Sequence, residues 1–103
     1  SRGLGDVYKR QDDIDFDMNV LASELGIGRS KLYLRIKEIT GLTPNELTLK
    51  IKLEEAMYLL NNQPNLNISE ISYQLGFSSP RYFSKCFKSF YGVSPQNCRK
   101  GVN

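Results

Sequence analysis

The sequence predicts an all-α fold in which two helix-turn-helix units are joined by a long central helix. Three observations lead to this prediction. Apolar residues in the candidate helices recur every three to four positions, as they do on the buried face of a helix. The chain repeats itself at an interval of fifty to fifty-one residues. Its length of 103 residues, 40% of them hydrophobic, suits one compact domain or two very small ones that share an element.

The internal repeat is the most informative feature of the sequence. VLASELG at 20–26 recurs fifty residues later as EISYQLG at 70–76, and the second helix of each copy recurs at fifty-one because the second turn has one extra residue. Each copy closes with a similar phrase, GLTPNE at 41–46 and GVSPQN at 92–97. The matched positions are Leu21 with Ile71, Leu25 with Leu75, Gly26 with Gly76, Leu32 with Phe83, Ile36 with Phe87, Ile39 with Phe90 and Gly41 with Gly92.

The N-terminal segment differs in character from the rest of the chain. Its first eleven residues, SRGLGDVYKRQ, show no sustained period. We therefore expect residues 1–15 to form a disordered leader or linker that lies outside the fold.

The first unit is expected at 16–43. Asp17 can cap a helix from about residue 18 to 25, and Gly26 would end it. A second helix is predicted from about residue 29 to 40. Its expected inner face consists of Leu32, Ile36 and Ile39.

A connecting helix is expected within 44–63. Thr43, Pro44 and Glu46 form a helix start, and the helix should run to about Asn61. Its roughly 18 residues would span on the order of 27 Å. Because it is apolar on most sides, we expect it to pack against both flanking units.

The second unit is expected at 64–103. Asn67 and Glu70 have the spacing of a capping box for a helix that ends at Gly76. Ser79 and the proline after it predict the start of a helix that continues to about residue 90. Ser94, also followed by proline, predicts a last short helix.

The chain lacks the residues on which most catalytic and metal sites depend. It contains no histidine, and its two cysteines, Cys86 and Cys98, are not in CxxC spacing. A disulfide is one alternative for them, but Cys86 falls inside a predicted helix, which favours a reduced packing residue. No paired carboxylates or glycine-rich phosphate loop are present either. We therefore expect no enzyme activity, no metal and no cofactor or small-molecule ligand.

Charge is distributed unevenly along the chain. From Ile71 to the C-terminus there are five Lys or Arg residues and no Asp or Glu, whereas five aspartates lie within the first 17 residues. A region of one sign is usually solvated surface, but it also attracts phosphate backbones. No apolar run approaches the roughly 20 residues that a membrane span needs, so we expect a soluble, intracellular chain.

The second helix of each unit is the candidate for DNA recognition, because the second helix of a helix-turn-helix lies in the major groove. With the apolar triads facing inward, the outward residues and the predicted caps form the candidate DNA-binding set. In the first unit these are Arg29, Ser30, Lys31, Tyr33, Leu34, Arg35 and Lys37. In the second they are Ser79, Pro80, Arg81, Ser84, Lys85 and Lys88.

A basic helix face seen alone is more often merely solvated. Two equivalent helices with such a face, one without any acid, favour a polyanion as the partner. If the connecting helix is rigid, the two recognition helices could lie about 34 Å apart and enter successive major-groove segments of one duplex. The main alternative is a helical interaction module whose basic faces bind an acidic protein.

From about Phe16 to Lys100 the chain resembles the DNA-binding domain of AraC/XylS-type bacterial transcription regulators, which has two homeodomain-like helix-turn-helix units. The specific match lies in ISYQLGFSSPRYFSKCFKSFYGVSP, at Gly76, Phe77, Tyr82, Phe83, Phe87, Lys88, Gly92 and Pro95.

The segments LASELGIGRSKLYLRIKEITGLTPNEL and IKLEEAMYLL resemble the output domain of hybrid two-component sensor regulators. The resemblance implies a cytoplasmic domain that binds double-stranded DNA, whether or not the full-length protein is anchored to a membrane. It also implies a sensor, receiver or dimerisation region elsewhere in that protein. By position, it implies base contacts from Ser30, Leu34, Pro80, Arg81 and Lys85.

Overall fold

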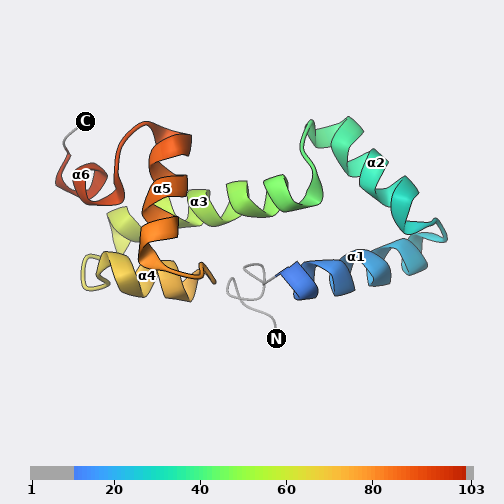
Figure 1. The fold of residues 1–103 in the computed structure, drawn as a ribbon, viewed down its shortest axis with the longest axis horizontal. Coiled ribbons are helices and arrows are strands. Elements are labelled where there is room, and N and C mark those ends of the chain that lie inside the picture. Colours follow the sequence, from blue (N-terminus) through green and yellow to red (C-terminus); the bar gives the residue numbers. More distant parts are fainter. Residues whose placement is uncertain (1–10, 102–103) are drawn as a thin grey trace. The chain divides into compact units, whose positions relative to one another are not determined.

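The computed structural model describes residues 11–101, with side chains from residue 18 onward, and within that range it has six helices and no strand (Figure 1). The predicted all-α fold class is therefore confirmed. None of the helices in the described range is long and apolar enough to cross a bilayer. The helices are α1 (Gln11–Leu25), α2 (Arg29–Thr40), α3 (Pro44–Asn62), α4 (Ile68–Gln74), α5 (Pro80–Tyr91) and α6 (Pro95–Lys100).

The chain divides into two compact units, Ser1–Lys50 and Ile51–Asn103, and α3 contributes residues to both. The first unit contains the helix-turn-helix pair α1 and α2, and the second contains the pair α4 and α5. The finer division expected from the sequence, with a connecting segment of its own at 44–63, stays a prediction.

Helix α1 begins earlier than the sequence suggested. It starts at Gln11 and not near residue 18, so Asp17 lies inside the helix and is not its N-cap. Residues 11–15, expected in a disordered leader, are helical. The apolar period of this segment is too weak to predict a helix. Polar and acidic residues can nevertheless extend a helix whose C-terminal part is stabilised by apolar packing. The rest of the expected leader, 1–10, lies outside the described residues.

The core of the first unit is small. Met18 and Ala22 of α1 and Leu32 of α2 are buried, and Ile27 and Ile36 pack partly buried against them. The prediction that Ile39 also faces the core is wrong, because its side chain is 82% exposed. Burial falls along α2 from Leu32 to Ile36 to Ile39, so the apolar period identified the inner face but not the point where the core ends.

The core of the second unit is larger and aromatic. Phe83 and Phe87 are fully buried on α5, and Phe77, in the turn before α5, lies with its ring centroid 5.1 Å from that of Phe83. Leu53 of α3 and Ile71 of α4 are also almost completely buried. The prediction that Phe90 faces inward is wrong, since it is 46% exposed and packs edge-on against Tyr91. Its position matches that of Ile39, so both recognition helices leave the core at the same point of the repeat.

The predicted helix starts after the first unit are confirmed by their hydrogen bonds. The amide of Glu46 donates to Thr43 Oγ1 at 3.1 Å, and Glu46 Oε1 accepts from the Thr43 amide, which makes a capping box for α3. The same reciprocal pair joins Asn67 and Glu70 at the start of α4. Ser94 caps α6 by accepting from the amide three residues later. Because the Thr43 bonds favour the ionised carboxylate, they lower the pKa of Glu46.

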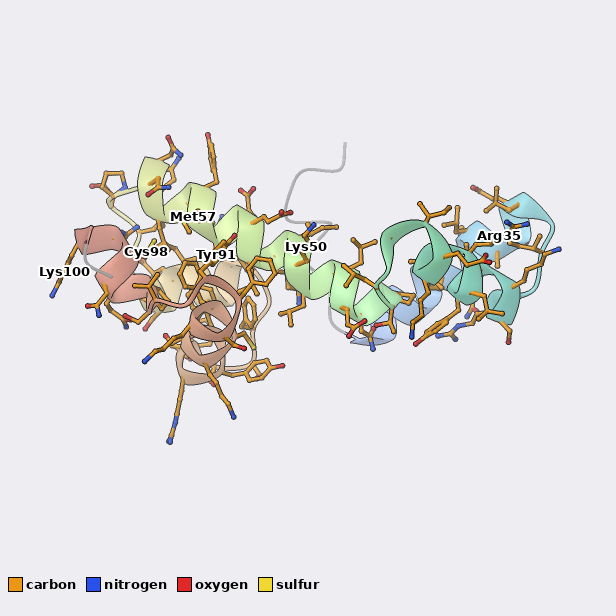
Figure 2. The ribbon with its side chains drawn as sticks, turned by 90° about the horizontal axis from the view of Figure 1, so that it is seen from above. Arg35, Lys50, Met57, Tyr91, Cys98 and Lys100 are labelled. Atoms are coloured by element: carbon orange, nitrogen blue, oxygen red, sulfur yellow. The ribbon has the colours of Figure 1, made fainter. Side chains whose placement is uncertain are left out.

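Residues of α6 hold the C-terminal half of α3. Cys98 Sγ lies 3.6 Å from Met57 Sδ (Figure 2), and both cysteines are free, as expected. The guanidinium of Arg99 donates to the carbonyls of Leu60, Gln63 and Leu66, at the end of α3 and in the loop between α3 and α4. The last carbonyls of a helix have no partner within it, so a planar group with several donors can satisfy them together. Arg99, one of the C-terminal cations noted in the sequence, therefore serves the fold.

Replacing Arg99 with Met should destabilise the second unit, because three carbonyls lose a charged donor while most of the apolar stem is kept. The expected loss is about 2 kcal/mol in the free energy of unfolding, measured by urea denaturation. Lys100→Met is the matched control, since the exposed neighbour should change stability by less than about 0.5 kcal/mol. Equal stability of the two variants would show that the carbonyl contacts contribute nothing.

Candidate nucleic-acid interface

Helices α2 and α5 are structural equivalents. Each has 12 residues and ends at a glycine in the left-handed conformation, Gly41 with φ 76° and Gly92 with φ 79°. In both, the amide of that glycine donates to the carbonyl four residues earlier, at Lys37 and at Lys88, over 2.7 Å. Side chains with a Cβ rarely adopt this conformation, so both recognition helices have a fixed end. The sequence repeat is thus also a repeat of local structure.

The predicted site residues of α2 all lie exposed, while Leu32 on the opposite side is buried. In the middle of this face Leu34 is 60% exposed. Leu34 lines two shallow depressions of the surface. The first is bordered by Arg29, Ser30 and Tyr33, and the second by Lys31, Arg35 and Glu38.

Glu38 is an acid on this face that the prediction from sequence did not include. Its Oε1 lies 4.0 Å from Arg35 Nη1, and both side chains are well exposed. An exposed pair at this spacing contributes about 0–1 kcal/mol, so little would be lost if Arg35 turned to a phosphate. The spacing of three residues along one helix was visible in the sequence and could have indicated the pair.

The outward face of α5 carries Arg81, Lys85 and Lys88, all exposed. Their spacing of four and three residues places them on one side of a helix. Phe83 and Phe87 lie on the other side and are fully buried. Ring packing therefore fixes which side of α5 carries the charges, and α5 itself contains no acidic residue.

The remaining predicted residues of the second unit are less accessible. Ser79, Pro80 and Ser84 are half-buried. Ser79 is the N-cap of α5, and its Oγ accepts a hydrogen bond from the Tyr82 amide at 3.0 Å. Its hydroxyl oxygen is therefore already used in holding the start of the helix. The α2 and α5 sets belong to different compact units.

Tyrosines at the two ends of α5 stay protonated at neutral pH. Interaction with the Cys86 thiol raises the pKa of Tyr82, which lies half-exposed beside the cationic face. Burial, with Glu54 and Cys98 adding to it, raises the pKa of Tyr91, whose hydroxyl donates to the Leu53 carbonyl at 3.2 Å. Both hydroxyls are thus neutral and both have a partner within the fold, the Cys86 thiol for Tyr82 and the Leu53 carbonyl for Tyr91.

The helix-turn-helix domain family matches residues 21–101 of the chain. Among curated proteins, histidine kinase P4 of Formosa agariphila is 46% identical over 80 residues, which is 78% of this chain and 6% of that protein. The Msm operon regulatory protein of Streptococcus mutans is 40% identical over 85 residues, which is 82% of this chain and 30% of that protein. The chain therefore spans much less than half the length of either relative.

A solved structure has the same fold. It is a transcriptional regulator from Chromobacterium violaceum, described among AraC-type DNA-binding domain-containing proteins. It superposes with a TM-score of 0.72 at 28% identity, over 81% of this chain and 73% of that one.

The two recognition helices differ in how they start, and this difference can be tested. The N-cap residue of α2 is Gly28, which provides no side-chain cap, has an extended backbone and leaves open space where a Cβ would stand. Gly28→Ser should supply the cap that Ser79 gives α5, so we expect the first unit to gain about 0.5–1 kcal/mol. Thermal unfolding followed by circular dichroism measures the change.

Two further variants serve as controls for this measurement. Ser79→Ala should cost about 1 kcal/mol, because the Tyr82 amide loses its acceptor. Gly41→Ala should also destabilise, since its φ of 76° disfavours a side chain. A Gly28→Ser protein that melts at or below the wild-type temperature would contradict the assignment of Gly28 as an uncapped helix start.

Proposed function

Because this chain belongs to the AraC-type helix-turn-helix family of DNA-binding domains, we propose that it reads a duplex site with α2 and α5, each placed in the major groove. One observation carries this proposal. Both helices expose a cation-bearing face while the opposite face is buried in the core of its own unit. A phosphate backbone attracts such faces without any rearrangement of the fold. The chain is accordingly the DNA-binding domain of a transcription regulator.

We propose that some of the exposed residues contact bases and that the others contact phosphates. Arg81, exposed in the first turn of α5, is the best candidate for a bidentate guanine contact, which is worth about 1–3 kcal/mol of discrimination. Lys85, one turn further on, can reach either a base or a phosphate. Four other cations of the two faces are assigned to phosphates: Lys31, Arg35, Lys37 and Lys88.

Leu34 gives the first unit a different chemistry. An exposed leucine on a recognition helix cannot donate a hydrogen bond, but it can contact the methyl group of thymine. Ser30, which is exposed one turn earlier in α2, is proposed as its polar neighbour at the bases. We therefore expect the first half-site to be defined by an A·T pair and the second by a G·C pair.

A single chain is proposed to bind two adjacent half-sites. Two recognition helices on one face of B-DNA need to lie about 34 Å apart. Helix α3 has 19 residues, a length of about 28 Å, which is of the order required for the connector. This spacing is a proposal about the complex with DNA.

The rest of the regulator is proposed to lie outside this chain. The relative from Formosa agariphila is named a histidine kinase, and this chain spans 6% of it. We infer that the domain is the output end of a two-component regulator, that it acts in the cytoplasm, and that a sensor, receiver or dimerisation region controls it. We assign it no catalytic reaction.

The alternative partner is an acidic protein surface, which the same cationic faces would also attract. Retention on immobilised duplex DNA, measured against increasing salt, distinguishes the two. We expect retention that falls steeply with salt and no comparable retention on an acidic protein.

Arg81 and Lys88 provide a matched pair for testing the division of contacts, since both are exposed cations of α5. Duplexes bound by each variant are selected from a random pool at two salt concentrations and sequenced. Arg81→Ala should relax the preference at one base pair by about 1–3 kcal/mol. Lys88→Ala should weaken all sequences alike and leave the enriched motif intact. If Arg81→Ala enriches the wild-type motif with wild-type affinity, α5 does not read the groove as proposed.

A further inference from the structure

Lys52 of α3 is a cation that the predicted interface did not include. It is half-buried in the second unit, and its Nζ lies 5.4 Å from the centroid of the Phe77 ring. Phe77 belongs to the turn between α4 and α5, shortly before Ser79, the capping residue of α5. The ammonium of Lys52 is therefore held beside the turn of the second helix-turn-helix.

Phe77 connects this ammonium to the first turn of α5. Its ring lies 6.0 Å from that of Tyr82 and 5.1 Å from that of Phe83. Phe77 and Phe83 are both buried, so the turn cannot shift without disturbing the core. The Phe77 ring thus contacts both Lys52 and the first turn of α5, in which Arg81 precedes Tyr82.

The charge of Lys52 has no counter-charge within the described part of the chain. No carboxylate among residues 18–101 pairs with it, and burial alone lowers the pKa of its amine. Partial burial of a cation costs free energy, and contact with an aromatic ring returns only about 0.5–2 kcal/mol. The environment of Lys52 therefore favours an anion supplied by another molecule.

We propose that Lys52 is a phosphate contact for the duplex that α5 reads, held in place by the Phe77 ring. The inference rests on the proposed function, because the DNA backbone is the anion it invokes. Lys52 is then a contact from the connecting helix, additional to those of the recognition helices. It carries no sequence preference, because phosphates are the same at every base pair.

A purely structural role is the competing explanation. The long stem of Lys52 covers part of Phe77 whatever its charge does, as lysine stems often do on apolar surface. The two roles predict different salt dependence. Loss of one phosphate contact lowers the slope of log affinity against log salt by about 0.9, whereas loss of packing lowers affinity at every salt concentration and leaves the slope unchanged.

The test compares four versions of this 103-residue chain: wild type, Lys52→Met, Lys52→Arg and Lys100→Met. Methionine keeps most of the stem, and arginine keeps the charge. Lys100 is an exposed cation on α6 (Figure 2). Helix α6 contacts the C-terminal end of α3, whereas Lys52 lies near the start of the part of α3 that belongs to the second unit. Each protein is titrated at several salt concentrations with one duplex enriched by the wild type. Thermal unfolding of each is recorded in parallel.

Lys52→Met should bind about three- to tenfold more weakly at low salt, with a slope reduced by about 0.9. Lys52→Arg should restore most of the affinity and most of the slope, and Lys100→Met should change neither quantity. All four proteins should select the same motif. Wild-type affinity in Lys52→Met, or weaker binding with an unchanged slope, would overturn the inference and leave the proposed function standing. If the wild type shows no salt-dependent binding to any duplex, the proposed function fails and this inference fails with it.

Discussion

The packing of Phe77, Phe83 and Phe87 is the interaction on which the second unit depends. Ring centroids 5.1 Å apart between the first two and 5.8 Å apart between the last two form a continuous aromatic layer beneath α5. Because these rings occupy one side of a helix, the cations at the remaining positions have to face solvent. The orientation of the proposed DNA surface is therefore a consequence of core packing.

In the first unit, core packing also orients the outer helix, but less surface is buried. Its core residues are Met18, Ala22 and Leu32, where the second unit has fully buried aromatic rings. Small apolar side chains bury less area, so we expect α2 to be held less firmly than α5. Helix α2 also lacks a side-chain cap and carries Glu38 on its outer face. From these differences we expect α5 to be the stronger DNA-reading element and α2 the supporting one, with Leu34 as the proposed apolar contact.

Much of this arrangement was predictable from sequence because its signals are local. The capping residues Thr43, Asn67, Ser79 and Ser94 each satisfy amides three residues away, so chemistry within one turn determines where α3 to α6 begin. The features that escaped prediction depend on tertiary position. The helical period treats Ile39 like Leu32, yet only the structure shows that α2 has passed the end of its core. The early start of α1, the carbonyl contacts of Arg99 and the place of Lys52 above Phe77 also involve distant or weakly patterned residues.

If α2 and α5 read neighbouring segments of one duplex, affinity must depend on the spacing between the two half-sites. The measurement is affinity for a series of duplexes in which the two half-sites are moved apart one base pair at a time. We predict an optimum near one helical turn of about 10 base pairs, and a marked loss of affinity when about 5 more base pairs move the half-sites to opposite faces. Affinity that is indifferent to this insertion would contradict it, because a single helix would then account for all of the binding.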